Sequence, residues 1–238
     1  MPRLVGAVVL AALVFVALAI GAPTLWQAWR PAGDTAATGP SQTPAPWQIR
    51  IGDDGSSEVF GLRLGRTMLA DAALRWPGED LQVALLRAQD RTLTLEAYLE
   101  SIQASGVQGK LVLGTVPDDA LAQAWATRTA RETPLASGAH RLNLQSDDWR
   151  QAQTQVIDSL LFLPAARLTE ATLVERFGEP GERLATTDGL VHLLYAERGL
   201  AISLADEGRQ RTVLQYVSPR DFARLRAPLL RAIAAPAQ

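Results

Sequence analysis

Residues 92 to 100 read Thr-Leu-Thr-Leu-Glu-Ala-Tyr-Leu-Glu, with an apolar side chain at every second position. This alternation is typical of a β-strand with one face on a core and the other toward solvent. We expect Leu95, Ala97 and Leu99 to point inward and the polar side chains, Glu96 among them, to point outward. Strands with one solvated face are typical of antiparallel sheets.

Short elements on either side of this strand form a small unit with it. A helix is predicted over residues 67–76, because apolar residues fall on one helical face and Pro77-Gly78 ends the pattern. Strands are predicted over residues 81–85 and about 107–116, with turn residues between them. The predicted order is therefore one short helix followed by an antiparallel meander.

The middle of the chain is less regular. Pro117-Asp118-Asp119 predicts a helix start, with acidic residues in the first turn, and Ser146-Asp147-Asp148 predicts another. A short strand is expected near 141–145. The dense apolar run Val156–Leu163 fits a helix or a strand, and periodicity leaves both open.

The first order of elements then returns. A short helix begins at Thr169-Glu170 and is stopped by Gly178-Glu179-Pro180. Four strands are expected after it, at residues 183–187, 190–196, 200–204 and 211–217. A final helix begins at Ser218-Pro219. Two passes of helix and meander predict an internal duplication and an α+β fold of tandem units.

The N-terminal stretch Leu4–Trp26 contains no charged residue, and its apolar part is long enough to cross roughly 30 Å of hydrocarbon as a helix. It predicts a transmembrane helix in the lipid bilayer, with Trp26, Trp29 and Arg30 at the far membrane interface. The alternative is a cleaved secretory signal, because residues 17–21 contain suitable small residues.

Flanking charges predict the orientation of this segment. Arg3 and the amino terminus outweigh Arg30, which favours a cytoplasmic N-terminus, a single pass through the inner membrane and a periplasmic body. Signal cleavage would instead release the body into the periplasm.

Composition divides the chain into five parts. These are an anchor or uncleaved signal at 1–30, a Pro/Ala/Thr-rich linker at 31–47, a first α+β unit at 48–145, a second at 146–232 and a tail at 233–238. The linker has no large apolar residue to bury before Trp47, so we expect an extended tether.

Cysteine content and charge exclude several functions. The chain has no cysteine, which excludes disulfides, a thiolate nucleophile, Cys-based metal sites and lipoprotein acylation. Its net charge of −2 and its scattered arginines provide no positive surface for nucleic acid. We therefore expect no nucleic-acid partner.

The motifs that resemble catalytic or ligand sites are incomplete. The segment Gly106–Leu111 lacks the first glycine and the Ser/Thr of a phosphate loop, so it is interpreted as the beginning of a strand. The acid pairs Asp53-Asp54, Asp118-Asp119 and Asp147-Asp148 are adjacent in sequence, and the last two stand where helix caps belong. Capping is favoured over acid–base chemistry or cation binding.

The two histidines lie far apart in the chain. His192 is flanked by apolar residues in a predicted strand, so we interpret it as a face residue with a local hydrogen bond rather than a zinc ligand or general base. His140 has no partner in sequence that suggests a site. No serine lies in a Gly-x-Ser-x-Gly elbow. We expect no catalytic residue, no metal and no cofactor.

Three aromatic residues are candidates for contact anchors. Aromatic side chains dominate many binding hot spots, and Trp149, Tyr195 and Tyr216 are candidates in the second unit. A place in the core is the alternative for each of them.

The segment Leu168–Pro180, with a following strand that ends in Tyr195, resembles the repeat of the SmpA/OmlA (BamE-like) envelope proteins. The resemblance covers residues 168–217, and a weaker copy covers 61–116 with Trp76-Pro77-Gly78 at the helix stop. Tandem copies of a similar unit occur in β-lactamase inhibitory proteins. The resemblance implies protein binding in the cell envelope and no catalysis, although this chain lacks the cysteine of the lipid-anchored members.

Three functional hypotheses follow from these observations. The leading one is a membrane-anchored, non-catalytic protein-interaction or assembly module that binds an unidentified envelope protein. The second is a periplasmic ligand-binding or enzymatic domain with a pocket between the two units. The third is a structural spacer or regulator of envelope assembly.

Overall fold

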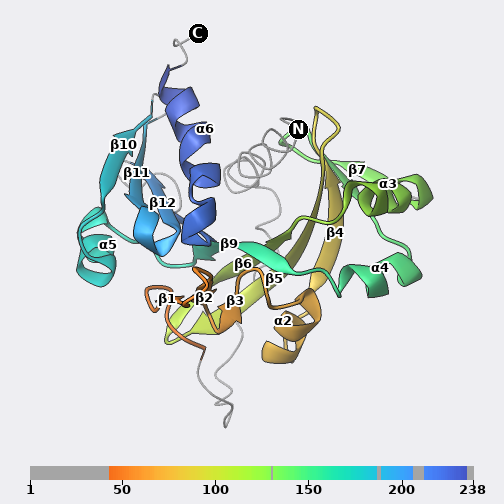
Figure 1. Ribbon diagram of the computed structural model, residues 1–238, viewed down its shortest axis with the longest axis horizontal. Coiled ribbons are helices and arrows are strands. Elements are labelled where there is room, and N and C mark those ends of the chain that lie inside the picture. The colour runs from red at the N-terminus through yellow and green to blue at the C-terminus, as the bar shows by residue number, and fades with distance from the viewer. Residues whose placement is uncertain (1–42, 130, 187–188, 206–211, 235–238) are drawn as a thin grey trace.

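The computed structural model describes residues 43–129, 131–186, 189–205 and 212–234, and a ten-stranded antiparallel sheet dominates them (Figure 1). In sheet order the strands are β10 (Glu182–Ala185), β11 (Leu190–Tyr195), β12 (Leu200–Ala205), β13 (Val213–Val217), β9 (Ile157–Pro164), β6 (Val107–Thr115), β5 (Leu93–Ala104), β4 (Gln82–Arg87), β8 (His140–Leu142) and β7 (Glu132–Pro134).

The predicted fold class, α+β with two tandem units, is wrong, and the transmembrane helix predicted in front of them lies outside the described residues. The described residues form mostly β-sheet with few helices, and the two meanders share one sheet. Strand β9 joins them, because Leu113 of β6 pairs with Leu160 and Tyr216 of β13 pairs with the same residue from the other side.

The apolar run that periodicity could not assign becomes this joining strand. Side chains on both faces of β9 belong to hydrophobic clusters, with Leu160 and Phe162 on one side and Leu161 on the other. A strand covered on both faces shows a continuous apolar run instead of alternation, so its sequence cannot be distinguished from a buried helix.

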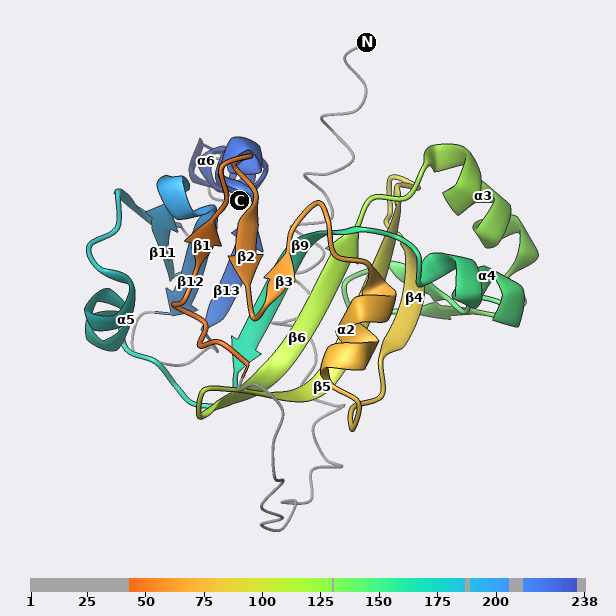
Figure 2. The ribbon, with the colours of Figure 1, turned by 60° about the horizontal axis from the view of Figure 1, so that its bottom comes forward.

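A second, three-stranded sheet lies over the large one (Figure 2). It contains β1 (Arg50–Ile51), β2 (Ser57–Val59) and β3 (Leu62–Arg63). The turn between β2 and β3 inserts Phe60 into the core, where its ring centroid lies 5.1 Å from that of Phe162 and 5.8 Å from that of Tyr216. Ser57 Oγ also donates a hydrogen bond to Val217 O, which ties the small sheet to β13.

In the described part of the chain, five α-helices and two 3₁₀ turns surround the sheet. They are α2 (Leu69–Arg75), α3 (Asp119–Arg128), α4 (Ser146–Ala152), α5 (Glu170–Phe177), η2 (Ala196–Arg198), η4 (Pro219–Asp221) and α6 (Ala223–Ala234). The sequence-predicted caps are partly correct. Asp118 and Thr169 accept hydrogen bonds from the first turns of α3 and α5, whereas α4 begins after Gln145 and carries the acid pair inside its first turn.

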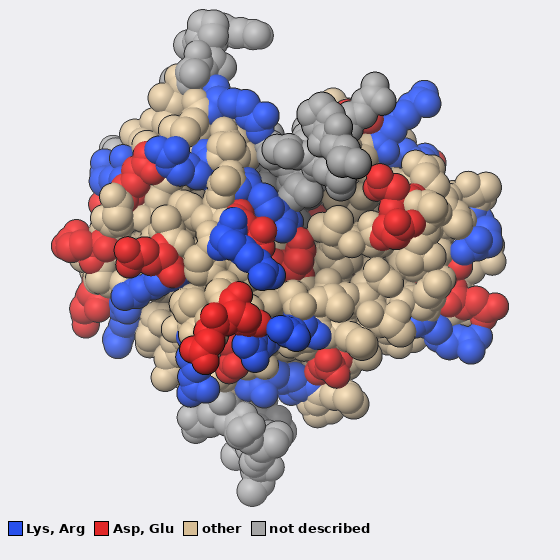
Figure 3. Space-filling view, viewed as in Figure 1, with Lys and Arg blue, Asp and Glu red and all other residues tan. Residues whose placement is uncertain are grey.

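The large sheet has two different faces. The first face carries Leu95, Ala97 and Leu99 and packs under β1–β3 and helices α2 to α5 in one large hydrophobic core. The second face carries Glu96 and Val112, and α6 covers its β10–β13 end through a smaller cluster that includes Phe222. In the view of Figure 3 basic and acidic side chains are interspersed over the surface.

The predicted membrane segment, residues 4–26, lies outside the described residues, as do Trp26, Trp29, Arg30 and most of the linker. Within the described ranges, no helix has the length and apolar character needed to span a bilayer. The last residues of the expected linker pack against the body, because Tyr216 donates a hydrogen bond of 3.1 Å to Pro46 O.

Candidate functional site

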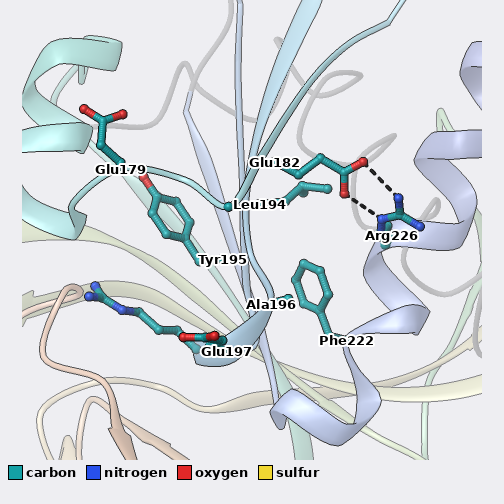
Figure 4. Close-up of a pocket in the computed structure, with 10 residues that line it drawn as sticks. Glu179, Glu182, Leu194, Tyr195, Ala196, Glu197, Phe222 and Arg226 are labelled. Carbon is teal, nitrogen blue, oxygen red and sulfur yellow. Dashed lines mark hydrogen bonds and ion pairs between the residues drawn. The ribbon is translucent and has the colours of Figure 1, made fainter.

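A pocket of about 430 Å³ opens between the end of β11, η2 and the beginning of α6 (Figure 4). Its lining consists of Glu179, Gly181, Glu182, Leu194, Tyr195, Ala196, Glu197, Arg198, Phe222 and Arg226. All ten residues belong to the second half of the chain. The pocket therefore differs from the one that the ligand-binding hypothesis placed between the two units.

The loop after α5 builds one wall. The helix ends at Phe177, and Gly178 at φ 79° turns the chain so that Glu179 and Gly181 reach the pocket. Positive φ is the conformation that glycine adopts at little cost, which explains a glycine directly after the helix.

The short η2 turn builds the opposite wall. Gly199 closes this turn with φ 63°, and a Cβ at this position would collide with Val217 O on β13. The absence of a side chain lets the turn lie close against β13 and brings Glu197 and Arg198 to the rim. Phe222, directly before α6, and Arg226, in the first turn of α6, approach the pocket from the same side.

Both arginines of the lining already have partners. Arg226 binds the carboxylate of Glu182 with two hydrogen bonds of 2.6 and 2.9 Å, and these bonds lower the pKa of Glu182. Arg198 Nη1 donates a 2.6 Å hydrogen bond to Phe177 O. Figure 4 shows the Glu182–Arg226 pair between the strand and α6.

The remaining two carboxylates, those of Glu179 and Glu197, are exposed at the rim. No hydrogen bond or ion pair joins either of them to another described residue. The nearby Tyr195 hydroxyl donates to Gly178 O at 3.0 Å. Burial raises the pKa of Tyr195, Arg198 lowers it and the charge of Glu179 raises it again.

This arrangement, with two carboxylates at the rim that have no partner among the described residues, is chemically suited to binding a cation. The ten lining residues include no Ser, Cys, His or Lys, and their ionisable groups are three carboxylates, the Tyr195 hydroxyl and two guanidinium groups. Among the described residues, no group of three or more His, Asp or Glu side chains is arranged to hold a metal ion.

The three aromatic candidates have different surroundings. Tyr195 lines the pocket. Tyr216 is fully buried and binds Pro46 O, so it is a core residue. Trp149 lies on α4 with 38% of its surface exposed, away from the pocket.

The interpretation of His192 as a strand-face residue with local hydrogen bonds is confirmed. The buried imidazole lies 2.8 Å from Ser203 Oγ through Nδ1 and 3.1 Å from Thr186 Oγ1 through Nε2. His140 lies on β8, near the opposite end of the sheet, with its Nδ1 3.4 Å from a carboxylate oxygen of Glu132.

One residue of each acid pair, and the glycine-rich segment, have structural roles. Asp54 accepts hydrogen bonds from Ser56 and two arginines, which lower its pKa, and Asp118 caps α3. Asp148 accepts two hydrogen bonds from Arg128, at 2.6 and 3.1 Å. Gly106, at φ 85°, forms the turn before β6, as predicted for the beginning of a strand.

Sequence reasoning did not find most of the pocket. Glu179 belongs to the sequence Gly178-Glu179-Pro180, which was predicted to end a helix. The residues that line the pocket with it come in part from the η2 turn and from α6, which no sequence pattern connects to it. The Glu182–Arg226 pair spans 44 residues, and no sequence spacing indicates such a contact. The sequence did point to one pocket residue, Tyr195, which ends the strand after the BamE-like segment and was a candidate contact anchor.

A second unusual group lies on the second face of the sheet. Glu96, expected to face solvent, is fully buried, and Tyr98 donates a hydrogen bond to its Oε2. The residues that pair with Glu96 on both neighbouring strands, Ala84 and Gly114, are small. The alternation therefore predicted correctly on which face of the sheet Glu96 lies, but it did not predict that Glu96 is buried there.

No family model, curated protein or solved structure matches this chain. The similarity of residues 168–217 to a BamE-like repeat stays a prediction. Function is therefore inferred from the chemistry of the pocket.

Proposed function

We propose that this protein is a non-catalytic protein-interaction module of the bacterial cell envelope, which binds a partner protein as a binding or assembly scaffold. The observation that carries this proposal is the pocket between η2 and α6. It combines apolar walls with two rim carboxylates, Glu179 and Glu197, and its lining contains no Ser, Cys, Lys or His.

The walls of this pocket are held in place by the hydrophobic clusters. Leu194 and Phe222 belong to the cluster under α6, and Tyr195 belongs to the main core. A binding site whose walls are already ordered loses little side-chain entropy when a partner binds. Anchor pockets of protein interfaces combine such apolar walls with a polar rim.

The proposed location is the periplasmic side of the inner membrane. The uncharged sequence Leu4–Trp26 supports export, as a single-pass anchor in the lipid bilayer or as a signal whose cleavage would release the body to the periplasm. Proteinase added to intact spheroplasts should digest the body in both cases. Protection until lysis would contradict this location.

Site-specific photo-crosslinking in intact cells tests the interaction. A photo-reactive amino acid replaces Ala196, an exposed residue of the pocket lining, in the full-length chain. A matched probe replaces Gln123, an exposed residue of α3 far along the sheet from the pocket. The Ala196 probe should enrich the same envelope protein repeatedly and the Gln123 probe should not. Identical products from both positions, or none from Ala196, would contradict the proposal.

A further inference from the structure

We infer that the pocket between η2 and α6 receives a basic side chain, lysine or arginine, from the partner polypeptide. This inference rests on the proposed function and names the chemistry of the partner at the same site. Three properties of the lining carry it: the charge balance, the apolar walls and the position at the outer edge of the sheet.

The charge balance favours a cation. The lining contains three carboxylates and two guanidinium groups. Glu182 and Arg226 neutralise each other, and Arg198 is bound to a backbone carbonyl. The carboxylates of Glu179 and Glu197 are left without a hydrogen bond or ion pair from the described residues. An anionic group in this pocket would be repelled by both, whereas a cation would be attracted.

The apolar walls favour a cation that is carried on a hydrocarbon stem. Leu194, Tyr195 and Phe222 are the large apolar and aromatic residues of the lining, and each is less than a tenth exposed. Lysine and arginine bury their methylene stems against apolar surface and keep the charged end at a polar rim. Figure 4 shows Tyr195 and Phe222 on two sides of the space, with Glu197 at its edge. Aromatic rings near a cation add further attraction.

The position of the pocket favours a polypeptide as the source of that cation. Gly181 and Glu182 line the pocket where β10 begins, and β10 is the last strand in the order of the large sheet. A segment of a partner that lies along this side of the molecule can insert one side chain into the pocket. The volume of about 430 Å³ suffices for one long side chain and part of its neighbours.

The test combines crosslinking with charge removal. The Ala196 photo-probe is placed in a Glu179→Gln/Glu197→Gln chain, which keeps the size of both side chains and removes their charges. The matched control is Asp53→Asn/Asp119→Asn, which removes two exposed charges outside the pocket. We expect the crosslink yield to fall about fivefold or more in the pocket variant and to stay unchanged in the control. An unchanged thermal midpoint confirms that the variants fold.

Direct titration of the full-length protein in neutral detergent identifies the ligand class. The probes are the amidated pentapeptides Gly-Gly-Arg-Gly-Gly, Gly-Gly-Gln-Gly-Gly and Gly-Gly-Glu-Gly-Gly, together with free L-arginine. The arginine peptide should bind most tightly, more weakly at higher salt, and about fivefold more weakly to the pocket variant.

The outcomes separate the inference from the proposed function. A crosslink from Ala196 that persists at full yield in the pocket variant overturns the inference that the partner inserts a basic side chain. The proposed function as a protein-interaction module would still stand. Equal binding of free L-arginine and the arginine peptide overturns the polypeptide source, because the site would then be one for small cations. The absence of both crosslinks and peptide binding overturns the inference and the proposed function together.

Discussion

Tyr98 donates a hydrogen bond to Oε2 of Glu96, two residues earlier on the same strand, where Glu96 has no solvent exposure. Burial raises the pKa of Glu96 to about 8, and the hydrogen bond from Tyr98 lowers it only in part. Burial also raises the pKa of Tyr98 well above its ordinary value, as does the charge of Glu96, while Arg141 lowers it. At neutral pH most Glu96 side chains therefore carry a proton.

The first prediction concerns pH. The carboxyl of Glu96 has a pKa of about 8 in the folded chain against a reference value of 4.5, so between these values the folded state binds more protons than the unfolded state. The stabilisation is fully present below about pH 4.5 and is lost as the pH rises through 8. Urea unfolding at pH 5, 6.5 and 8 should show a free energy of unfolding that falls by about 3.5 kcal/mol across this range.

The control for this prediction is Glu96→Gln, which keeps an acceptor for Tyr98 and cannot ionise. Its stability should change little between pH 5 and 8. Arginine partners lower the pKa values of Glu170 and Glu182. These two carboxyls therefore take up protons only below the tested range, and they do not change the stability between pH 5 and 8. A wild-type profile that is flat from pH 5 to 8 would contradict the buried, protonated state.

The second prediction concerns the contact between α3 and α4. Asp148 is 5% exposed and binds Arg128 through two hydrogen bonds. Asp148→Ala removes both hydrogen bonds and leaves the Arg128 guanidinium without its carboxylate partner. Because the Arg128 side chain is about half exposed, solvent compensates part of the loss, and we expect a destabilisation of about 2 kcal/mol in urea unfolding. Asp147→Ala, at a position exposed to solvent, should cost about 0.5 kcal/mol or less.

The third prediction concerns Gly199, which closes the η2 wall of the pocket. Gly199→Ala places a methyl group against Val217 O at a positive φ, so the turn must shift away from β13. We expect a loss of about 3 kcal/mol in the free energy of unfolding and a weaker crosslink from the pocket. Gly78→Ala has open space around the new methyl group and should cost less than about 1 kcal/mol. Equal effects of the two substitutions would contradict the close contact.

The fourth prediction concerns the segment that leads into the body. Tyr216→Phe removes the hydroxyl that binds Pro46 O and leaves that carbonyl without its donor. The cost should be about 1 kcal/mol. Hydrogen exchange at the amide of Gln48, which donates to Ala45 O, should become faster, because the same segment loses its tie to β13. Unchanged exchange at Gln48 would show that other contacts hold the segment.

Local pattern predicted the second meander well. The strands expected at 190–196 and 200–204 are β11 (190–195) and β12 (200–205), and the expected helix from Thr169 is α5. Hairpins and capped helices depend on neighbours in the chain, so their signals are present in short stretches of sequence.

Long-range contacts were not predictable from the same patterns. The run at 156–163 became a strand because β6 and β13 pair with it from two sides. The pocket exists because the segment from η4 into α6 brings Phe222 and Arg226 back to the beginning of β10. Nothing in the periodicity of either segment specifies its partner across tens of residues.

The sequence by itself determined the hairpin strands β11 and β12, the starts of α3 and α5 and the inward side of β5, since these follow from backbone propensity, capping residues and apolar residues at every second position. The tertiary structure alone decided that the two meanders share one sheet, that Glu96 is buried with a raised pKa, and that Glu179 and Glu197 lie at one pocket. The reason is that pairing partners, burial and the pKa of a carboxyl depend on groups distant in sequence, which only the folded chain brings together.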